Sequence, residues 1–133
     1  MATEGLSHIT YIVRDLEKAA AFFCQGLGGV EVYDSEGRNF SVSREKFFLV
    51  GGVWIVAMEG EPDPDQGYRH VAFKVDESEL SVFEDRLAAL GARFRPGRSR
   101  VEGEGQSLYV YDFDGHLFEL HSGTIESRLK SYR

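Results

Sequence analysis

Two histidines occur at matching positions of a repeated segment, and residues of this type can bind a metal ion. His8 is the third residue of the run at residues 6–13, LSHITYIV, and His70 is the third residue of the run at residues 68–75, YRHVAFKV. Both runs are rich in β-forming residues, whose side chains alternate between the two faces of a strand. Glu119 lies in a further run of this kind near the end of the chain. These three side chains can therefore point, from different strands, into the same concave side of a curved sheet.

Two neutral imidazoles and one carboxylate suit a divalent transition metal that keeps open coordination positions. Such positions let the metal polarise a substrate oxygen. A single histidine on a strand is usually structural, but a register-matched pair with an inward glutamate indicates a metal site. We therefore predict that the ligands are His8, His70 and Glu119. His121 shares a face with Glu119 and can also serve as a ligand, although hydrogen bonding at the rim is the favoured interpretation. His116 is expected to belong to a turn or to support a ligand from behind.

A second carboxylate stands just before an apolar run. Glu45 lies in the segment SREKFF and alternates in step with Phe47 and Leu49, so it can point inward. An inward carboxylate near a metal can act as a general base. The segment alone favours the other interpretation, a solvated charge at the start of a strand, and both interpretations stay open here.

Basic residues gather in one stretch of the otherwise acidic chain: Arg93, Arg95, Arg98 and Arg100. A glycine-rich loop follows at residues 103–105, and Ser107 and Tyr109 then fall on one face of a predicted strand. Arginines, hydroxyl groups and flexible backbone amides are suited to a phosphate or phosphonate. The alternative is a solvated basic loop. Arg128 lies in a C-terminal helical segment that Thr124 can cap.

The elements that must position these residues follow from periodicity. Apolar residues recur at helical spacing between residues 16 and 27 and between residues 80 and 90, and Asp15 and Asp76 can cap these helices. Strands are expected at residues 30–33, 40–43, 47–50 and 53–58 in the first half and at residues 92–95, 107–111 and 116–121 in the second. Gly51-Gly52 and Asp114-Gly115 are hairpin-turn signals.

Each half therefore has the pattern strand, helix and three strands, and the fold class is α+β. We expect a single domain over residues 1–133, built of two βαβββ modules at about residues 5–60 and 68–122 plus a short C-terminal helix. Neither module can bury its sheet alone, so two modules are expected to pair, within or between chains, as one curved mixed sheet around a metal-containing cup. The alternative is a ferredoxin-like sandwich of unrelated halves.

Composition narrows the class of partner. The 133 residues carry a net charge of −7, which disfavours nucleic acid or an anionic membrane as the partner. With 42% hydrophobic residues the chain can bury a core. The sequence shows no apolar run long enough to span a membrane and no signal-peptide pattern. Cys24 is the single cysteine, and together these features predict a cytoplasmic location.

The whole pattern resembles the fosfomycin-resistance proteins of the vicinal-oxygen-chelate superfamily, and among them the metal-dependent epoxide hydrolases of the FosX group. The resemblance covers nearly the whole chain and rests on four segments: GLSHIT at 5–10, SREKFFL at 43–49, RSRVEGEG at 98–105 and FELHSGT at 118–124. The second and third are specific to the group. One position departs from the family pattern, which has arginine after Gly-Glu-Gly where this chain has Gln106.

The resemblance implies a homodimer in which Mn²⁺ is bound by His8 of one chain and by His70 and Glu119 of the other. It implies fosfomycin, a small epoxide that bears a phosphonate, as the substrate, with the metal binding the epoxide oxygen and a phosphonate oxygen. Glu45 would deprotonate a water that attacks the ring carbon next to phosphorus and gives a diol. Positions that match phosphonate contacts in the family are Arg98 (or Arg100, two residues later), Ser107, Tyr109 and Arg128.

Several other functions share parts of this pattern. A thiol transferase would open the same epoxide with glutathione or a similar thiol, but such relatives lack the SREKFF segment. A glyoxalase-like isomerase uses a carboxylate from each half, and here Val56 stands at the position equivalent to Glu119. An extradiol dioxygenase uses the same ligand types with iron, usually in longer chains. A binding protein that sequesters a drug without chemistry needs no metal ligands.

Overall fold

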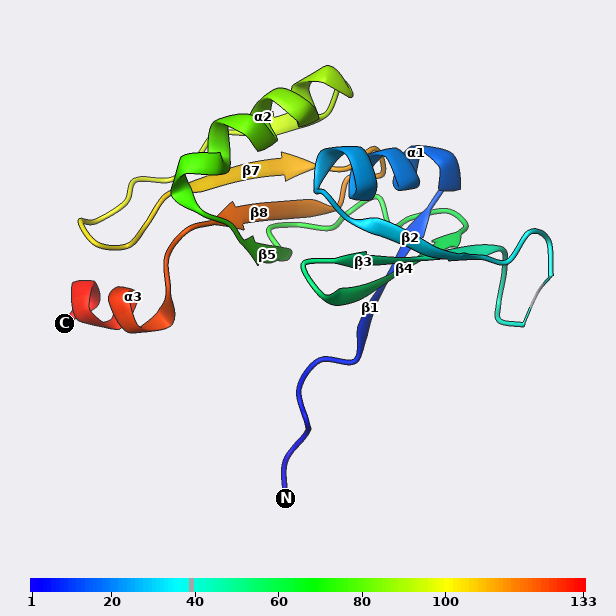
Figure 1. Ribbon diagram of the computed structural model, residues 1–133, viewed down its shortest axis with the longest axis horizontal. Helices are drawn as coiled ribbons and strands as arrows, with labels where there is room; N and C mark the ends of the chain where they lie inside the picture. The colour runs from blue at the N-terminus through cyan, green and yellow to red at the C-terminus, as the bar shows by residue number, and fades with distance from the viewer. Residues whose placement is uncertain (39) are drawn as a thin grey trace.

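The two halves of the chain fold into matching four-stranded sheets, with α1 and α2 on one side of them (Figure 1). The structure is a computed structural model and describes residues 1–38 and 40–133. The first half contains β1 (His8–Val13), α1 (Leu16–Ala20) continued by a π-helical segment (Ala21–Gly26), β2 (Val30–Asp34), β3 (Glu45–Val50) and β4 (Val53–Glu59). The second contains β5 (His70–Lys74), a 3₁₀ turn (Glu77–Glu79), α2 (Leu80–Ala89), β6 (Arg93–Arg95), β7 (Ser107–Tyr111) and β8 (Leu117–His121), and α3 (Ile125–Tyr132) ends the chain.

The strand order confirms the internal repeat. It is β1-β4-β3-β2 in the first sheet and β5-β8-β7-β6 in the second, so corresponding strands hold the same places. In each sheet the strand that carries the repeated histidine is parallel to its neighbour, and the other pairs are antiparallel. The fold is therefore the predicted α+β class with mixed sheets. In the part of the chain that the structure describes, the two modules form two separate sheets.

An apolar core joins the two modules behind the sheets. Its centre is aromatic, and Phe22, Phe23, Phe48 and Phe118 are fully buried. The ring of Phe23 lies 5.3 Å from that of Phe48 in the first sheet and 5.7 Å from that of Phe118 in the second, measured between centroids. Figure 1 shows α1 and α2 together on this side of the molecule. The predicted helical faces are thus confirmed, and they supply the apolar side of both sheets.

The predicted alternation along the histidine strands is also confirmed. Ile9, Tyr11 and Val13 pack against the core, whereas His8 and Thr10 are exposed on the other face. In the second sheet the residues that pack on the core include Val71, Phe73 and Phe118. Each sheet therefore has one face fixed by burial and one face free to carry polar side chains.

Local signals explain where the elements begin and end. The Asp15 carboxylate accepts hydrogen bonds from the backbone amides of Glu17 and Lys18, at 2.9 and 3.1 Å, and so caps α1 as predicted. Gly51 and Gly52 join β3 to β4 with φ of 55° and 80°. Two consecutive positive φ angles are what a tight two-residue hairpin requires, so this turn is confirmed.

One predicted strand is wrong. Residues 40–43 form bends, and β2 pairs directly with β3, which begins at Glu45. Phe40 and Val42 are 80% and 87% exposed, so their apolar character reflects no packing in the chain. The Ser43 hydroxyl instead donates to the carbonyl of Glu59 at 2.7 Å. The other predicted strands are present with shifts of a few residues at their ends.

Among the described residues, none of the helices has the length and apolar character needed to cross a membrane.

The aromatic core predicts a large loss of stability on truncation of Phe118. Phe118→Ala should lower the free energy of unfolding by about 3–5 kcal/mol, because it removes a fully buried ring and leaves a cavity. Phe40→Ala removes the same atoms from a ring that is 80% exposed and should cost about 0.5 kcal/mol or less. Urea unfolding of both variants and the parent measures this. Equal losses for the two variants would contradict the assignment of the core.

Candidate metal and anion site

His70 and Glu119 form a pair with the geometry of half a metal site. Their side chains share the polar face of the second sheet, and His70 Nε2 lies 3.1 Å from Glu119 Oε1. His70 Nδ1 lies 2.7 Å from the carbonyl oxygen of Tyr68. Since a carbonyl only accepts, Nδ1 must carry the hydrogen, which leaves Nε2 as an acceptor in the neutral ring. In that form of the ring two acceptors face each other, and a cation between them would satisfy both.

The atoms that His70 and Glu119 present to each other are of the types that bind metal ions. Histidines that bind metals usually donate the other ring N–H to a carbonyl or carboxylate, which fixes the tautomer and the ring orientation. His70 has this contact through Tyr68. One imidazole nitrogen and one carboxylate oxygen are also ligands that divalent transition metals accept. The residues present therefore fit the predicted cofactor site, although they supply two ligands and not three.

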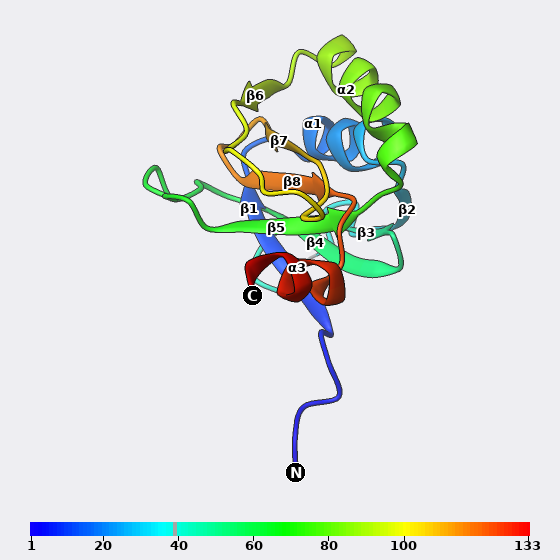
Figure 2. The same cartoon turned by 90° about the vertical axis from the view of Figure 1, so that its left-hand side faces the viewer.

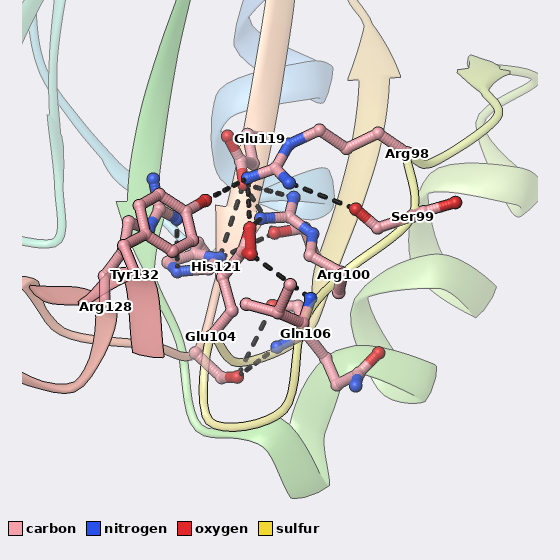
Figure 3. A network of polar contacts seen from close by, with 12 residues as sticks. Arg98, Ser99, Arg100, Glu104, Gln106, Glu119, His121, Arg128 and Tyr132 are labelled. Carbon is pink, nitrogen blue, oxygen red and sulfur yellow. Dashed lines mark hydrogen bonds and ion pairs between the residues drawn. The ribbon is translucent and has the colours of Figure 1, made fainter. Parts of the chain in front are cut away.

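Glu119 is a buried carboxylate whose charge is compensated by its neighbours. Only 5% of the residue is exposed. Its Oε2 accepts hydrogen bonds from Ser107 Oγ at 2.5 Å and from an Arg100 guanidinium nitrogen at 3.2 Å (Figure 3). Burial alone raises the pKa of Glu119, but the Ser107 hydrogen bond and nearby positive groups outweigh it, so the pKa is lowered. The carboxylate is therefore ionised at neutral pH and available to a cation.

His121 connects this carboxylate to the C-terminal helix. Its Nδ1 lies 2.6 Å from Ser107 Oγ, and its Nε2 lies 3.1 Å from a guanidinium nitrogen of Arg128. Burial, together with the positive charges of Arg128 and Arg100, lowers the pKa of His121. The sequence predicted a hydrogen-bonding residue at this position, and the structure places it at the centre of a network (Figure 3).

The predicted anion-binding residues lie around Glu119, with one rearrangement. Arg100, and not Arg98, reaches the carboxylate of Glu119. Arg100 also donates to the Tyr109 hydroxyl at 2.7 Å and to Glu104 at 3.0 Å. Arg98 forms an ion pair with Glu104 and lies 3.4 Å from the Tyr132 hydroxyl. It is therefore farther from Glu119 in the network than Arg100 is.

Two buried side chains organise these arginines. Glu104 is 1% exposed, and its ion pairs with Arg98 and Arg100 lower its pKa to about 2 despite its desolvation. Burial, together with the neighbouring Tyr68 hydroxyl and Glu119 charge, raises the pKa of Tyr109 to about 12, so this hydroxyl stays neutral. The sequence pattern singled out Tyr109 but gave no role to Glu104, which lay inside the motif GEG without a periodic signal.

An open pocket of about 550 Å³ lies between this network and α3. His70, Glu119 and His121 line it from the sheet, and Arg128 lines it from the helix. Figure 2 shows α3 below the second sheet, on the side opposite α2. The predicted cap is present, because the Thr124 hydroxyl accepts from the backbone amide of Ser127 at 3.1 Å. The cap therefore sets where α3 begins, and so where Arg128 projects.

Gln106, the position that departs from the family pattern, does not enter this network through its side chain. Its backbone amide donates to the Ser122 hydroxyl at 2.9 Å, and Figure 3 shows its side chain directed away from Glu119. Among the described residues, the Gln106 side chain therefore does not contribute to the hydrogen bonds of the carboxylate.

The remaining predicted residues lie on the first sheet. His8 is exposed on β1, where its ring lies against that of Trp54 in a tilted arrangement, at 4.3 Å between centroids. The strand register pairs His8 with Trp54 on β4, and it pairs Glu45 on β3 with Met58 on β4, four residues farther along. Paired residues share a face, and Trp54 and Met58 are an even number of residues apart. His8 and Glu45 therefore lie on the same face.

Glu45 is not a solvated charge in this structure. It is 7% exposed at the start of β3. The next residue, Lys46, points to the opposite face, where its Nζ forms ion pairs with Glu31 at 2.9 Å and Asp34 at 3.3 Å. Because these ion pairs hold Lys46 on the helix side, alternation directs Glu45 to the face that also carries His8.

One chain does not bring the predicted ligands together. His8 and Glu45 belong to the first sheet, whereas His70 and Glu119 belong to the second. Over residues 1–38 and 40–133, no three His, Cys, Asp or Glu side chains lie close enough to hold one metal ion. Within one protomer, the described residues therefore do not bring the predicted triad together.

Comparisons with known proteins agree with this architecture. Residues 5–120 match the family described as the Glyoxalase/Bleomycin resistance protein/Dioxygenase superfamily. The chain is 51% identical over 128 residues, 96% of either chain, to the fosfomycin resistance protein FosX of Listeria monocytogenes. It is 38% identical to the metallothiol transferase FosB of Shouchella clausii, over 96% of this chain and 86% of that one.

A solved structure gives the same result. The fold superposes with a TM-score of 0.89 on a crystal structure of a FosX variant from L. monocytogenes complexed with Mn(II) and 1S,2S-dihydroxypropylphosphonic acid. That match has 48% sequence identity and covers 99% of this chain and 100% of that one. This chain therefore belongs to the glyoxalase/bleomycin resistance protein/dioxygenase superfamily and, within it, to the FosX group of fosfomycin resistance proteins.

Proposed function

We propose that this protein is a manganese-dependent epoxide hydrolase that opens fosfomycin with water. The observation that carries the proposal is the ionised, buried Glu119 beside His70 Nε2, at 3.1 Å, in a pocket that Arg128 also lines. The FosX relative supports the choice of metal and substrate, because its structure holds Mn(II) and a dihydroxypropylphosphonic acid. A diol on a propylphosphonate skeleton is what hydration of fosfomycin would give.

The metal ligands are His70 and Glu119 of one chain and His8 of a second copy. Mn²⁺ bound there would act as a Lewis acid toward the epoxide oxygen. Arg100 and Ser107 hold Glu119 Oε2 from the far side, which leaves Oε1 toward His70. The chain thus orients its carboxylate ligand before any metal arrives.

Glu45 is the general base. Its carboxylate takes a proton from a water molecule, whose oxygen forms a bond to the ring carbon next to phosphorus. The bond between that carbon and the ring oxygen breaks, and the ring oxygen keeps the electron pair and takes up a proton, so that water and epoxide give one diol. Burial of Glu45 on the face that carries His8 keeps the base out of bulk solvent.

The phosphonate binds to the groups that surround Glu119. Arg128 projects from α3 into the pocket, and the neutral Tyr109 hydroxyl and Ser107 lie on β7 beside β8. Arg98 is the outer of the two loop arginines and the more exposed, and its ion pair with Glu104 keeps it beside Arg100. Charge-assisted hydrogen bonds from such groups are stronger than neutral ones.

The active form is a homodimer with shared sites. The face of the first sheet that carries His8 also exposes the apolar side chains of Val30 and Leu49. The register makes Glu45 and Ser107 equivalent in the repeat, because Glu45 pairs with Met58 as Ser107 pairs with His121. Packing the first sheet of one copy against the second sheet of another would place the base opposite the anion-binding residues.

Loss of the ligand charge should weaken metal binding. Glu119→Gln keeps the shape of the side chain but removes its charge, so its affinity for Mn²⁺ should fall at least about tenfold and turnover should be lost. Glu102→Gln, in the exposed part of the loop, is the matched control and should bind Mn²⁺ like the parent. Electron paramagnetic resonance of free Mn²⁺ measures both. Normal Mn²⁺ affinity in Glu119→Gln would remove this residue from the ligand set.

Loss of the base should slow hydrolysis without affecting binding. Glu45→Gln should lower the rate of diol formation by about 10²–10⁴-fold, because a positioned general base contributes that much. Affinity for Mn²⁺ and fosfomycin should be retained. Glu59→Gln, an exposed glutamate at the end of β4, serves as the control. Parental turnover by Glu45→Gln, assayed with Mn²⁺ and without thiol, would refute the proposed mechanism.

Shared sites predict complementation between two inactive variants. His8→Ala and Glu119→Gln chains should each be inactive alone, but a mixed dimer contains one intact site. Equal co-expression should recover about one quarter of the parental activity per chain, because half of the dimers are mixed and each has one of its two sites intact. No recovery from a mixture whose mixed dimers are demonstrated by native mass spectrometry would show that each site belongs to one chain.

A further inference from the structure

Three consecutive hydrogen bonds connect Arg128 on α3 to the carboxylate of Glu119 (Figure 3). A guanidinium nitrogen of Arg128 lies 3.1 Å from His121 Nε2, and His121 Nδ1 lies 2.6 Å from Ser107 Oγ. Ser107 Oγ in turn lies 2.5 Å from Glu119 Oε2. The residues come from a helix and two neighbouring strands, and Glu119, His121 and Arg128 line the pocket.

The guanidinium at one end of this connection and the carboxylate at the other determine which atom donates in each hydrogen bond. A guanidinium only donates, so His121 Nε2 must accept, and the hydrogen of the neutral ring is therefore on Nδ1. His121 Nδ1 then donates to Ser107 Oγ. The serine hydroxyl has one hydrogen, and it must go to Glu119 Oε2, since an ionised carboxylate only accepts. A single tautomer of His121 satisfies the whole set.

We propose that His121 is a positioning residue that fixes the Ser107 hydroxyl as a donor to Glu119 and so orients the carboxylate for metal binding. The inference rests on the proposed function, because it takes Glu119 as a metal ligand. With Oε2 engaged by Ser107 and Arg100, Oε1 is the oxygen that faces His70. Without the His121 donor, the Ser107 hydroxyl can rotate away and Oε2 loses its shortest hydrogen bond.

The same connection links the anion-binding helix to the metal site. Arg128 has five N–H donors, so one can bond to His121 while others face the pocket. His121 also lies 3.3 Å from Glu119 Oε2, measured from Nδ1, which keeps the ring close to the carboxylate it serves. An aromatic ring without nitrogens would fill the same space but would make none of these bonds.

Three substitutions distinguish the contact that His121 Nδ1 makes with Ser107 from the contact that Nε2 makes with Arg128. In His121→Asn the amide nitrogen is two bonds from Cβ, as Nδ1 is, so it can still donate to Ser107. In His121→Gln the amide group is three bonds from Cβ, as Nε2 is, so it reaches Arg128 but not Ser107. His121→Phe removes both contacts. Ser122→Ala is the matched control, since among the described residues the Ser122 hydroxyl bonds only to the backbone of Gln106.

The measurement is the affinity for Mn²⁺ of the full-length protein in the absence of fosfomycin, with thermal unfolding as a check of folding. His121→Phe and His121→Gln should lose about 10–100-fold in affinity, as partners of metal ligands typically do on mutation. His121→Asn should stay within about threefold of the parent, and Ser122→Ala should equal it. Ser107→Ala should show the same loss as His121→Gln, and the double variant should lose no more than either one.

The outcomes separate this inference from the proposed function. Parental Mn²⁺ affinity in folded His121→Gln, or additive losses in the double variant, would overturn the positioning role while the effect of Glu119→Gln still stands. If His121→Phe does not fold, the His121→Asn and His121→Gln pair decides. An equal loss in that pair would mean that any histidine replacement disturbs the site and would also overturn the proposal.

Discussion

The arrangement of the second half of this protein depends on keeping one carboxylate ionised while it is almost fully buried. A carboxylate taken out of water is costly unless other groups replace its hydration. Glu119 is 5% exposed; Ser107 and Arg100 donate hydrogen bonds to its Oε2, and His70 lies beside its Oε1. These three come from β7, the loop before it and β5, so the requirement of one side chain sets how three segments meet.

A second buried carboxylate, Glu104, also has its charge compensated by arginines. Arg100 also bonds to Glu104, which is 1% exposed and in turn holds Arg98. A buried carboxylate of this kind gives the loop between β6 and β7 a defined conformation, although the loop has no regular secondary structure. The loop therefore keeps two arginines beside the pocket and returns the chain to β7 with Ser107 in contact with Glu119.

The sequence predicts the parts of this fold that depend on periodicity. Helical spacing identifies the faces of α1 and α2, alternation identifies the polar faces of the histidine strands, and the limits of β7 match those expected. Residues 40–43 mislead because Phe40 and Val42 have the composition of a strand without a pairing partner. Strand formation requires a neighbour to bond with, and the local sequence does not contain that information.

The candidate site is predictable to a similar degree. His70 and Glu119 meet as the repeat and the alternation require. The choice of Arg100 over Arg98 at Glu119, and the role of Glu104, depend on the path of an irregular loop, which residue types alone do not determine. The separation of His8 from the other ligands was expected only through the resemblance to a dimeric family. Alternation along a strand predicts the face on which a side chain lies, but it does not predict which chain packs against that face.

The central claim, that water and not a thiol opens the epoxide, is tested most directly by isotope labelling. The protein is incubated with Mn²⁺ and fosfomycin in H₂¹⁸O without thiol, and the product is examined by mass spectrometry and ³¹P nuclear magnetic resonance. The account predicts a diol with one ¹⁸O atom, bonded to the carbon next to phosphorus. Absence of diol until a thiol is added, with formation of a thioether adduct, would contradict it.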